Sequence, residues 1–401
     1  MSNNDNKQLL PLILNIGSDN FRLGWAGGDF PDLIAPSIYV DITDYLFNSN
    51  IIASDTIDGL EDIFLEPDNQ PHLVGHDALK YQNILKIREF SKESNYNILL
   101  KFFSYYYQQL NITEEFQFKQ PLIIITPFYK SELEKTKLQE IFFNSLNFPN
   151  ILFLPETQAI LSTLQKSSGV IVNIGESYTY ISTIFHGFTN IMARDMFPIT
   201  GSDITKYFLN LILSKISATK NIYIGKAIAK EIKERISLCV LDPNGEKKRV
   251  KEGLTKYDRV IDLPDGTKLN LNSERFLLSE PFFDPKIIHV DYMSLAEAIS
   301  KAVKSWDREN WEELLKNVIL SGGSSLISGL SERLELELQK HFSEKLKPKI
   351  KVVAASGREN MGWIGASVLY SKDQLKKGWI SNPNLNESDQ QQEDQITSNE
   401  Q

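Results

Sequence analysis

The chain of 401 residues contains one cysteine, Cys239. A single thiol excludes an intrachain disulfide framework and a cysteine-rich zinc site, and it is typical of a reducing intracellular compartment. Histidine is also scarce, and the five residues show no metal-ligand spacing. His72 and His76 are four positions apart, but they stand among proline and glycine in a loop-like context. We expect both at the surface, and no metal site built from them.

Long apolar runs and an excess of positive charge are also missing. No apolar run reaches membrane-spanning length, and the first eight residues are polar, unlike a signal peptide. We therefore expect a soluble protein with no membrane contact. The net charge of −9 excludes a broad nucleic-acid-binding surface, so no direct nucleic-acid partner is expected. A local basic patch stays open.

The tripeptide Asn-Ile-Gly occurs twice, at Asn15–Gly17 and at Asn173–Gly175. Each copy ends a short apolar run and leads through two polar residues into a second apolar segment, which is the pattern of a β-hairpin. The two copies are 158 positions apart and are the one internal repeat that the sequence supports. Two such hairpins on two lobes could hold a polyphosphate with their turn amides.

Strand-like runs alternate with helix-period segments elsewhere, which predicts an α/β fold. Expected strands lie at 122–126, 151–154 and 318–320. Ser131 and Glu134 form a capping-box pattern before a helix. Further helices are expected over 156–166 and after the turn at 321–325. The apolar faces of the first and last of these helices are Leu133, Leu138, Ile141, Phe142 and Leu146, and Leu330, Leu334 and Leu338.

Three segments read as surface elaborations. Residues 41–71 are acidic and rich in turn formers, and residues 382–401 are polar and expected to be disordered. Residues 244–258 are strongly charged and include the cluster Lys247–Lys251. That cluster fits a short nuclear-localisation pattern, although a charged exposed loop is the favoured interpretation.

Taken together, several motifs resemble actins and actin-related proteins in the order of that family. They are Asn15–Ser18 with Gly24–Gly27 and Pro36-Ser37, Glu156–Ser162, Asn173–Glu176, Lys230 with Lys233 and Glu234, Leu263–Gly266 with Glu274–Phe276, Leu320–Ser324, and Gly362–Ala366 with Trp379–Ser381. Each motif alone is weak, but seven in register over nearly the whole chain indicate the fold.

The resemblance implies an actin-like two-lobe fold, with RNase H-like mixed sheets and flanking helices around an interdomain nucleotide cleft. The first lobe would comprise 1–165 and 358–381, with an outer subdomain at about 40–85. The second lobe would comprise 166–357, with an outer subdomain at about 204–289. The acidic 41–71 stretch would fall where actin carries a filament-contact loop. Lys286–Ser294 would occupy the place of actin's hydrophobic plug, either as a contact or packed on its lobe.

The resemblance also implies the site residues. ATP or ADP would be held by Gly17, Ser18, Arg22, Gly175, Glu176, Gly201, Lys230, Lys233, Glu234, Gly322, Gly323 and Ser324. Gln158 matches the glutamine that positions the attacking water. Without the family frame, Gln158 could equally be an ordinary polar helix residue, and the lysines with Glu234 a solvated helix face.

The same frame shows departures around the phosphates. Asn15 and Asn173 replace the family aspartates that hold the hydrated divalent ion, so no metal ligand is assigned and Mg²⁺ is disfavoured. Without the family resemblance, both asparagines could be simple turn formers. Tyr180 stands where actins have a histidine, and tyrosine is a poor general base near neutral pH.

Two further departures concern phosphate and adenine. Asp19 replaces a glycine, where a carboxylate would repel phosphate unless it turns away, and Arg22 replaces a lysine. Glu359 stands at a lysine position, although the alignment could instead place Arg358 there. Gly175, Gly201 and the Gly322-Gly323 pair keep the close-approach backbone that a nucleotide needs.

The leading hypothesis is a structural subunit of a multiprotein complex, of the chromatin-remodelling or dynactin type, that hydrolyses ATP slowly or not at all. Its partners would be protein subunits, with actin or other actin-related proteins as candidates, in the cytoplasmic cytoskeleton or the nucleus. The alternative is an active ATPase that polymerises into filaments. Hsp70-like chaperones and sugar kinases share the cleft, but no substrate domain or catalytic carboxylate motif supports them.

Overall fold

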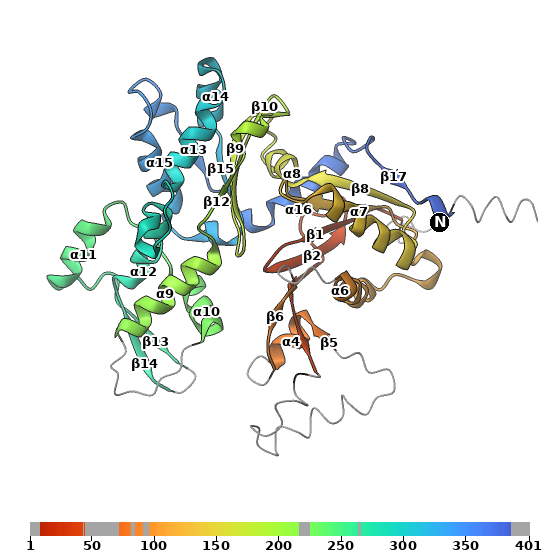
Figure 1. The fold of residues 1–401 in the computed structure, drawn as a ribbon, viewed down its shortest axis with the longest axis horizontal. Coiled ribbons are helices and arrows are strands. Elements are labelled where there is room, and N and C mark those ends of the chain that lie inside the picture. Colours follow the sequence, from red (N-terminus) through yellow and green to blue (C-terminus); the bar gives the residue numbers. More distant parts are fainter. Residues whose placement is uncertain are drawn as a thin grey trace, which may run out of the picture. The chain divides into compact units, whose positions relative to one another are not determined.

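The computed structural model describes residues 9–42, 44, 72–81, 85–90, 96–215, 225–263 and 266–385. The chain forms two compact units, Met1–Ala159 with Gly362–Gln401 and Ile160–Met361. Most of the acidic 41–71 stretch and residues 386–401 lie outside the described residues. Figure 1 shows the elements of each unit in sequence colours.

The first unit is built on a six-stranded mixed sheet with the order β17-β8-β7-β1-β2-β3. The antiparallel pairs are β1–β2, β2–β3 and β17–β8, and the parallel pairs are β1–β7 and β7–β8. The strands are β1 Leu12–Ile16, β2 Asn20–Trp25, β3 Leu33–Pro36, β7 Leu122–Thr126, β8 Asn150–Pro155 and β17 Ile380–Ser381.

The central strands are apolar on both faces, and helices cover each face. Leu12, Leu14 and Ile124 belong to one buried cluster with the aromatic side of α6, Tyr96–Gln108. Ile13 and Ile123 belong to the opposite cluster, which includes side chains of α8, Glu156–Thr163, and α16, Met361–Ser371. This double burial explains why these strands read as continuous apolar runs and not as alternating ones.

Helix α7, Glu132–Glu140, begins with the expected capping box. The Ser131 hydroxyl accepts a hydrogen bond from the Glu134 amide, and the Glu134 carboxylate accepts one from the Ser131 amide. The helix continues as a π-helical turn, η3, Ile141–Ser145, which buries Phe142. The expectation that Leu133 lies on the buried face is wrong, since it is 65% exposed.

A small antiparallel sheet, ordered β5-β4-β6, also belongs to this unit. Its strands are β4 Ile38–Asp41, β5 His72–Val74 and β6 Arg88–Glu89, and α4, Gly75–Lys80, follows β5. The loop assignment for the histidines is therefore wrong. His72 is in β5, 3.6 Å from a carboxylate oxygen of Asp41, and burial lowers its pKa. His76 is in the first turn of α4 and lies 3.2 Å from the carbonyl of Ile34.

The second unit repeats the arrangement of the first sheet. Its sheet has the order β11-β10-β9-β15-β16, with β12 paired to β10. β9 pairs antiparallel with β10 and parallel with β15, as β1 does with β2 and β7. The strands are β9 Gly169–Ile174, β10 Thr179–Phe185, β11 Phe188–Thr189, β12 Asp195–Phe197, β15 Val318–Ser321 and β16 Val352–Val353, with a separate hairpin of β13 Arg259–Asp262 and β14 Lys268–Leu271.

One large apolar cluster joins this sheet to the helices of the second unit. The α-helices are α9 Gly201–Lys215, α10 Lys226–Ile236, α11 Pro243–Lys251, α12 Glu274–Leu277, α13 Leu295–Lys304, α14 Trp311–Leu315 and α15 Leu330–Gln339. The short helical turns of both units are η2 Glu114–Phe116, η4 Ile191–Ala193, η5 Glu280–Phe282, η6 Pro285–Ile288, η7 Arg308–Asn310, η8 Gly323–Leu326, η9 Lys347–Lys349 and η10 Arg358–Asn360.

Three expectations about the surface are resolved by this fold. The cluster Lys247–Lys251 is not in a loop but in α11. Within the plug segment, Ile288, Val290, Tyr292 and Met293 pack against the core of their unit, whereas Ile287 is 38% exposed. The polar tail does not begin at Asn382, because this side chain is 1% exposed and donates hydrogen bonds to the carbonyls of Phe143 and Phe148.

None of the helices in the described part of the chain is long and apolar enough to cross a membrane.

Candidate functional site

The two Asn-Ile-Gly hairpins have the same turn geometry. The amide of Gly17 donates to the carbonyl of Asn20 at 3.1 Å, and the amide of Gly175 donates to the carbonyl of Tyr178 at 2.9 Å. A Cβ at either glycine would lie 2.7 or 2.8 Å from the same carbonyl oxygen. Both turns therefore require glycine, and the repeat seen in the sequence is also a repeat in structure.

In the first unit, the hairpin joins β1 to β2, and Asn15 and Arg22 are paired in its register. Each of these two residues is 8% exposed. The Arg22 guanidinium donates to the carbonyl of Asn20 at 3.1 Å, so the side chain lies back over its own turn. The hydroxyl of Ser37, in the next segment, donates to the carbonyl of Gly17 at 2.7 Å and holds the turn from the other side.

The backbone of Gly362 lies close to the side chain of Asn15. A Cβ at Gly362, in the first turn of α16, would lie 2.9 Å from the Asn15 amide nitrogen and 3.5 Å from Glu156. Ser18 and Asp19 form the tip of the hairpin, and the Asp19 carboxylate accepts a hydrogen bond from the Asn20 side chain at 3.2 Å. Gln158 is exposed on α8, two residues after Glu156.

In the second unit, the hairpin tip is tied to the start of α9. The amide of Gly201 donates to the carbonyl of Gly175, and the amide of Ser202 donates to the carbonyl of Glu176, both at 2.9 Å. Thr200 and Asp203 cap the helix through reciprocal hydrogen bonds. A Cβ at Gly201 would lie 2.1 Å from the Ser324 hydroxyl and 2.7 Å from the Glu176 carboxylate. Glycine is thus required where α9 meets the turn.

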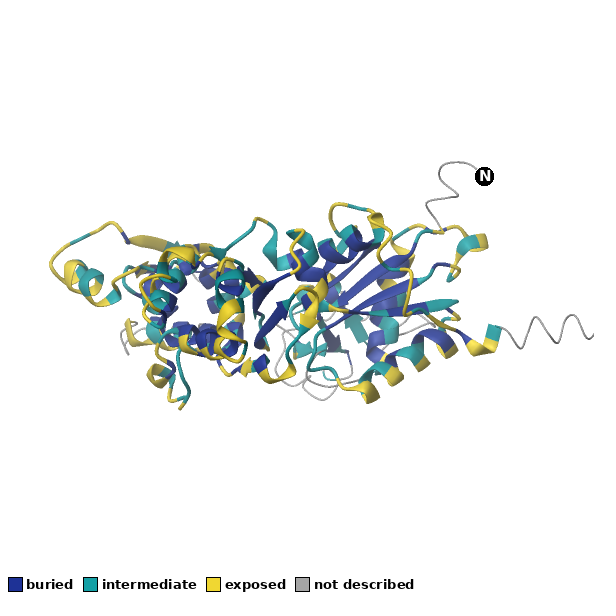
Figure 2. Cartoon of the chain, turned by 90° about the horizontal axis from the view of Figure 1, so that it is seen from above, coloured by how far each residue is buried: buried dark blue, intermediate teal, exposed yellow. Residues whose placement is uncertain are grey.

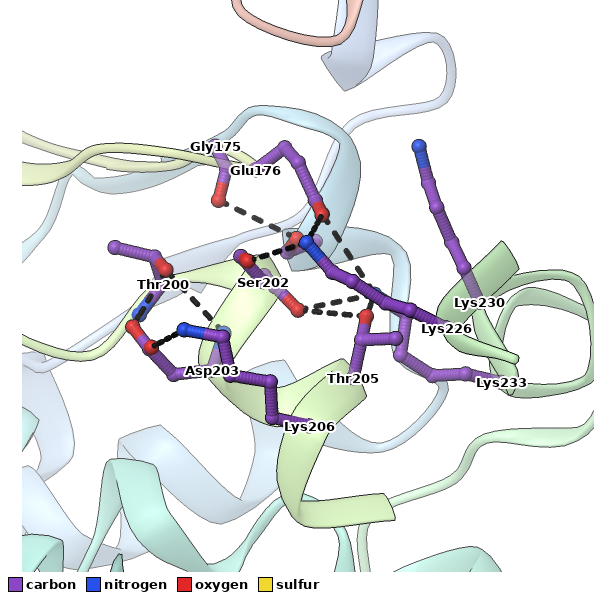
Figure 3. A network of polar contacts seen from close by, with 12 residues as sticks. Gly175, Glu176, Thr200, Ser202, Asp203, Thr205, Lys206, Lys226, Lys230 and Lys233 are labelled. Atoms are coloured by element: carbon purple, nitrogen blue, oxygen red, sulfur yellow. Dashed lines mark hydrogen bonds and ion pairs between the residues drawn. The ribbon is translucent and has the colours of Figure 1, made fainter. Parts of the chain in front are cut away.

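Two lysines of α10 converge on this junction, as Figure 3 shows. Lys233 is 5% exposed, and its ammonium donates to the carbonyl of Gly201 at 3.2 Å and to the hydroxyl of Thr205 at 2.8 Å. Lys226 donates to the hydroxyl of Ser202 at 2.8 Å. Each ammonium lies 3.9 Å from a different carboxylate oxygen of Glu176. The group therefore carries one negative and two positive charges beside the glycine backbone.

The interpretation of this helix face as solvated is wrong for Lys233 but describes Glu234. The side chain of Glu234 is 57% exposed and forms an ion pair with Lys230 at 3.9 Å. Lys226 and Ser202 were not among the residues expected from the sequence. The spacing could have found Lys226, since it lies seven positions before Lys233 and hence on the same face of α10.

The Gly322-Gly323 turn approaches the same hairpin from β15. Gly322 has φ +85°, and a Cβ there would lie 2.5 Å from the carbonyl of Ile174 and 2.6 Å from the Asn173 side-chain oxygen. Gly323 is different, because a Cβ there would meet nothing within 4 Å among the described residues. The Ser324 hydroxyl donates to the carbonyl of Gly175 at 3.5 Å. The turn thus has space for a side-chain atom or a ligand atom beside Gly323, but no such space beside Gly322.

Arg358 holds this turn in place. Its carbonyl accepts hydrogen bonds from the Gly322 amide and the Ser321 hydroxyl, each at 3.2 Å, and its guanidinium donates to the hydroxyl and the carbonyl of Ser325. Burial lowers the pKa of Arg358. The next residue, Glu359, has one carboxylate oxygen buried without a hydrogen-bond partner among the described residues. The hydrogen bonds of Arg358 therefore stabilise the Gly322-Gly323 turn.

Tyr180 is completely buried in β10, where it pairs in register with Asn173. It occupies the position in the second hairpin that Arg22 occupies in the first, 158 residues earlier. The side chain is 0% exposed, and tyrosine is a poor general base near neutral pH.

The junction of the second hairpin with α9 has features that suit an anionic ligand. Two ammonium groups and an open position beside Gly323 are features that suit phosphate oxygens, whereas the first amides of α9 already donate to Gly175, Glu176 and Thr200. Asn15 and Asn173 supply neutral amide groups only. In the described part of the chain, no group of three or more His, Cys, Asp or Glu side chains is placed to hold a metal ion.

Two mixed sheets with the same hairpin and the same strand pairing define a duplicated α/β fold of the actin type. The comparison with known families agrees, since residues 6–394 match the family Actin. The chain belongs to the actin family. It is 27% identical over 380 residues to an "Actin-like protein" of Neurospora crassa, an alignment that covers 92% of this chain and 94% of that protein.

Proposed function

We propose that this chain is a structural, nucleotide-binding subunit of a multiprotein complex that hydrolyses ATP slowly or not at all. One observation carries the proposal. The glycine backbone of both hairpins is preserved, whereas the two positions that match the family aspartates, Asn15 and Asn173, are both neutral amides. The chain thus keeps what a nucleotide needs for binding and lacks the charge that organises a metal and water for hydrolysis.

In this proposal, each unit is assigned residues that would contact a nucleotide. Gly17, Ser18 and Arg22 would serve in the first unit. Gly175, Glu176, Gly201, Lys226, Lys230, Lys233, Glu234, Gly322, Gly323 and Ser324 would serve in the second. A nucleotide bound only by the folded state stabilises the protein by about 2.7 kcal/mol at 100 times its Kd, without turnover. The nucleotide would act as a structural ligand.

The first test is the identity of the ligand that copurifies with the chain. The protein is purified without added nucleotide and denatured, and the released ligand is identified by ion-exchange chromatography. Intact ATP at one equivalent supports a binding subunit that does not turn over. ADP as the main species would contradict the proposal, and an empty site would mean that Asp19 and Glu359 prevent binding.

An active, polymerising ATPase is the second candidate, and Gln158 favours it because this residue matches the glutamine that positions water. The assays are phosphate release and pelleting of filaments after addition of ATP. If both remain at the level of a blank, this candidate is excluded. If both rise together with protein concentration, the structural proposal fails.

The partners are proposed as protein subunits of a complex of the chromatin-remodelling or dynactin type, with actin or other actin-related proteins among them. The length and acidity of the 41–71 stretch favour filament termination, since added charge would disturb a further actin-type contact. The Lys247–Lys251 cluster favours the nucleus only as a sequence pattern. Sedimentation of actin filaments with and without this chain distinguishes the two settings, because a terminating subunit shortens filaments.

A further inference from the structure

Helix α11 carries a concentrated positive charge on a chain that is acidic as a whole. Its nine residues contain four basic side chains and one acidic side chain, a net charge of +3, whereas the whole chain has −9. Figure 1 shows α11 at the periphery of its unit, and Figure 2 shows exposed residues there. The side chains of Lys248 and Arg249 are 78% and 63% exposed.

Three of the four basic residues of α11 lie on one side of the helix, and the fourth, Arg249, lies on the opposite side with its partner Glu246. At 3.6 residues per turn, Lys247, Lys248 and Lys251 fall within an arc of about 100°. The opposite side carries the less exposed Glu246 and Val250. Within the part of the chain that the structure describes, neither Lys247 nor Lys251 forms an ion pair. We call Lys247, Lys248 and Lys251 the α11 lysine face.

The remaining basic residue, Arg249, and one member of the lysine face, Lys248, each have an acidic partner in the same segment. Arg249 pairs with Glu246 at 2.8 Å, and Lys248 lies 3.9 Å from Glu252. Basic residues in the last turn also interact favourably with the helix dipole, which explains part of their presence. That effect reaches only the last turn and is small, about 0.3–1 kcal/mol for each residue. It does not require the lysines to share one exposed face.

The helix itself is fixed by its start. Asp242 is the N-cap and accepts a hydrogen bond from the Gly245 amide at 3.0 Å, and Pro243 is the first helical residue. A receptor that binds a basic cluster as an extended peptide would have to unwind α11 and break this cap, at a cost of about 1 kcal/mol or more. The folded helix therefore argues against a nuclear-localisation signal of the extended type.

We propose that the α11 lysine face docks an acidic segment of a partner protein. Charge complementarity supports a negatively charged partner, because opposite potentials steer association and fix orientation. An acidic polypeptide is favoured over nucleic acid, since three lysines offer few phosphate contacts. Leu241, which is 55% exposed just before the cap, adds an apolar contact that a polypeptide can use.

The test uses the full chain and a fluorescein-labelled 16-residue peptide rich in glutamate with two leucines, followed by fluorescence anisotropy. We expect binding at 50 mM NaCl that weakens at least fivefold at 300 mM, because salt screens exposed charges. The variant K247Q/K248Q/K251Q should bind at least tenfold more weakly. Glutamine keeps a high helix propensity, so circular dichroism should be unchanged.

A matched control removes the same charge elsewhere. Lys286, Lys301 and Lys345 are exposed lysines of the same unit and lie outside α11. The variant K286Q/K301Q/K345Q should change the affinity less than twofold, and K247R/K248R/K251R should retain binding. Absence of peptide binding at 50 mM NaCl would overturn the proposal, and so would an equal loss in the control variant. Tighter binding of a 20-base-pair DNA duplex that depends on the same lysines would instead identify a nucleic-acid surface.

Discussion

The buried carboxyl group of Glu280 gives the most quantitative prediction. Glu280 begins η5 and is 8% exposed. Its Oε1 lies 3.6 Å from the guanidinium of Arg333, and no described residue donates a hydrogen bond to that oxygen. Arg333 is engaged more closely by others, since it donates to Glu337 and to the carbonyl of Val240, each at 2.8 Å. Arg333 is therefore well compensated by other partners, whereas the Glu280 carboxylate depends on one distant guanidinium.

Burial, with smaller contributions from the charges of Glu337 and Asp284, outweighs the attraction of Arg333 and raises the pKa of Glu280 to about 7. In the unfolded chain the pKa is near the ordinary value of 4.5. Below pH 4.5 the group is protonated in both states and contributes no pH dependence. Between pH 4.5 and 7 the unfolded state loses the proton first, so the free energy of unfolding falls. At pH 8 the full cost is about 3 kcal/mol, at 1.36 kcal/mol for each pKa unit.

Glutamine at position 280 has nearly the same shape and does not ionise. The difference in unfolding free energy, E280Q minus wild type, should therefore increase by about 3 kcal/mol from pH 4.5 to pH 8. Urea unfolding at several pH values measures this difference. Tryptophan fluorescence follows the transition, and amide hydrogen exchange over 274–340 assigns it to the second unit. The comparison is differential, so any constant offset between glutamine and protonated glutamate cancels.

Glu309 provides the matched control, because it is an exposed glutamate of the same unit. The E309Q variant should track wild type at every pH. If the E280Q difference stayed flat from pH 4.5 to 8, the reasoning would be refuted. A difference that fell with rising pH would mean that the Glu280–Arg333 pair stabilises the ionised form and that its geometry outweighs burial.

The remaining predictions concern the candidate nucleotide site. The double variant N15D/N173D should restore Mg²⁺-dependent phosphate release above wild type, measured with a coupled phosphate assay; no increase would mean that another departure is limiting. G323A should leave the melting temperature unchanged and weaken nucleotide binding, since its Cβ enters open space, whereas G322A should lower the melting temperature because of φ +85° and a 2.5 Å contact. K226M should weaken binding of ATP at least threefold in calorimetry, and an unchanged Kd would remove Lys226 from the site.

Much of the fold could be predicted from the sequence because its signals are local. The two hairpins follow from an apolar run, a glycine turn and a second run, and both turns have the predicted geometry. The capping box of Ser131 and Glu134 is likewise a contact within one helical turn. Leu133 shows the limit of such reasoning, because periodicity identifies a helix face but not how far that face is covered.

The errors have physical causes of two kinds. The charged segment around Lys247 reads as a loop by composition, yet Asp242 and Pro243 supply a cap and a first helical residue that favour α11. The expectation of disorder is wrong for Asn382 itself, because its side chain satisfies two buried carbonyl groups that no sequence pattern reveals. Long-range hydrogen bonds of this kind depend on elements that are far apart in the chain, here by 239 and 234 residues.

In the candidate site, the glycines determine the backbone geometry, whereas the side chains at positions 15 and 173 determine the charge. Gly201 and Gly322 cannot accept a side chain without displacing backbone or the Glu176 carboxylate, so the hairpins would be disturbed if either changed. Asn15 and Asn173 stand under no such constraint, since an amide and a carboxylate have almost the same shape. Loss of both carboxylates therefore removes charge from the site and leaves the fold intact. Under the function proposed above, these two substitutions would remove the chemistry of hydrolysis and leave a nucleotide as a structural ligand.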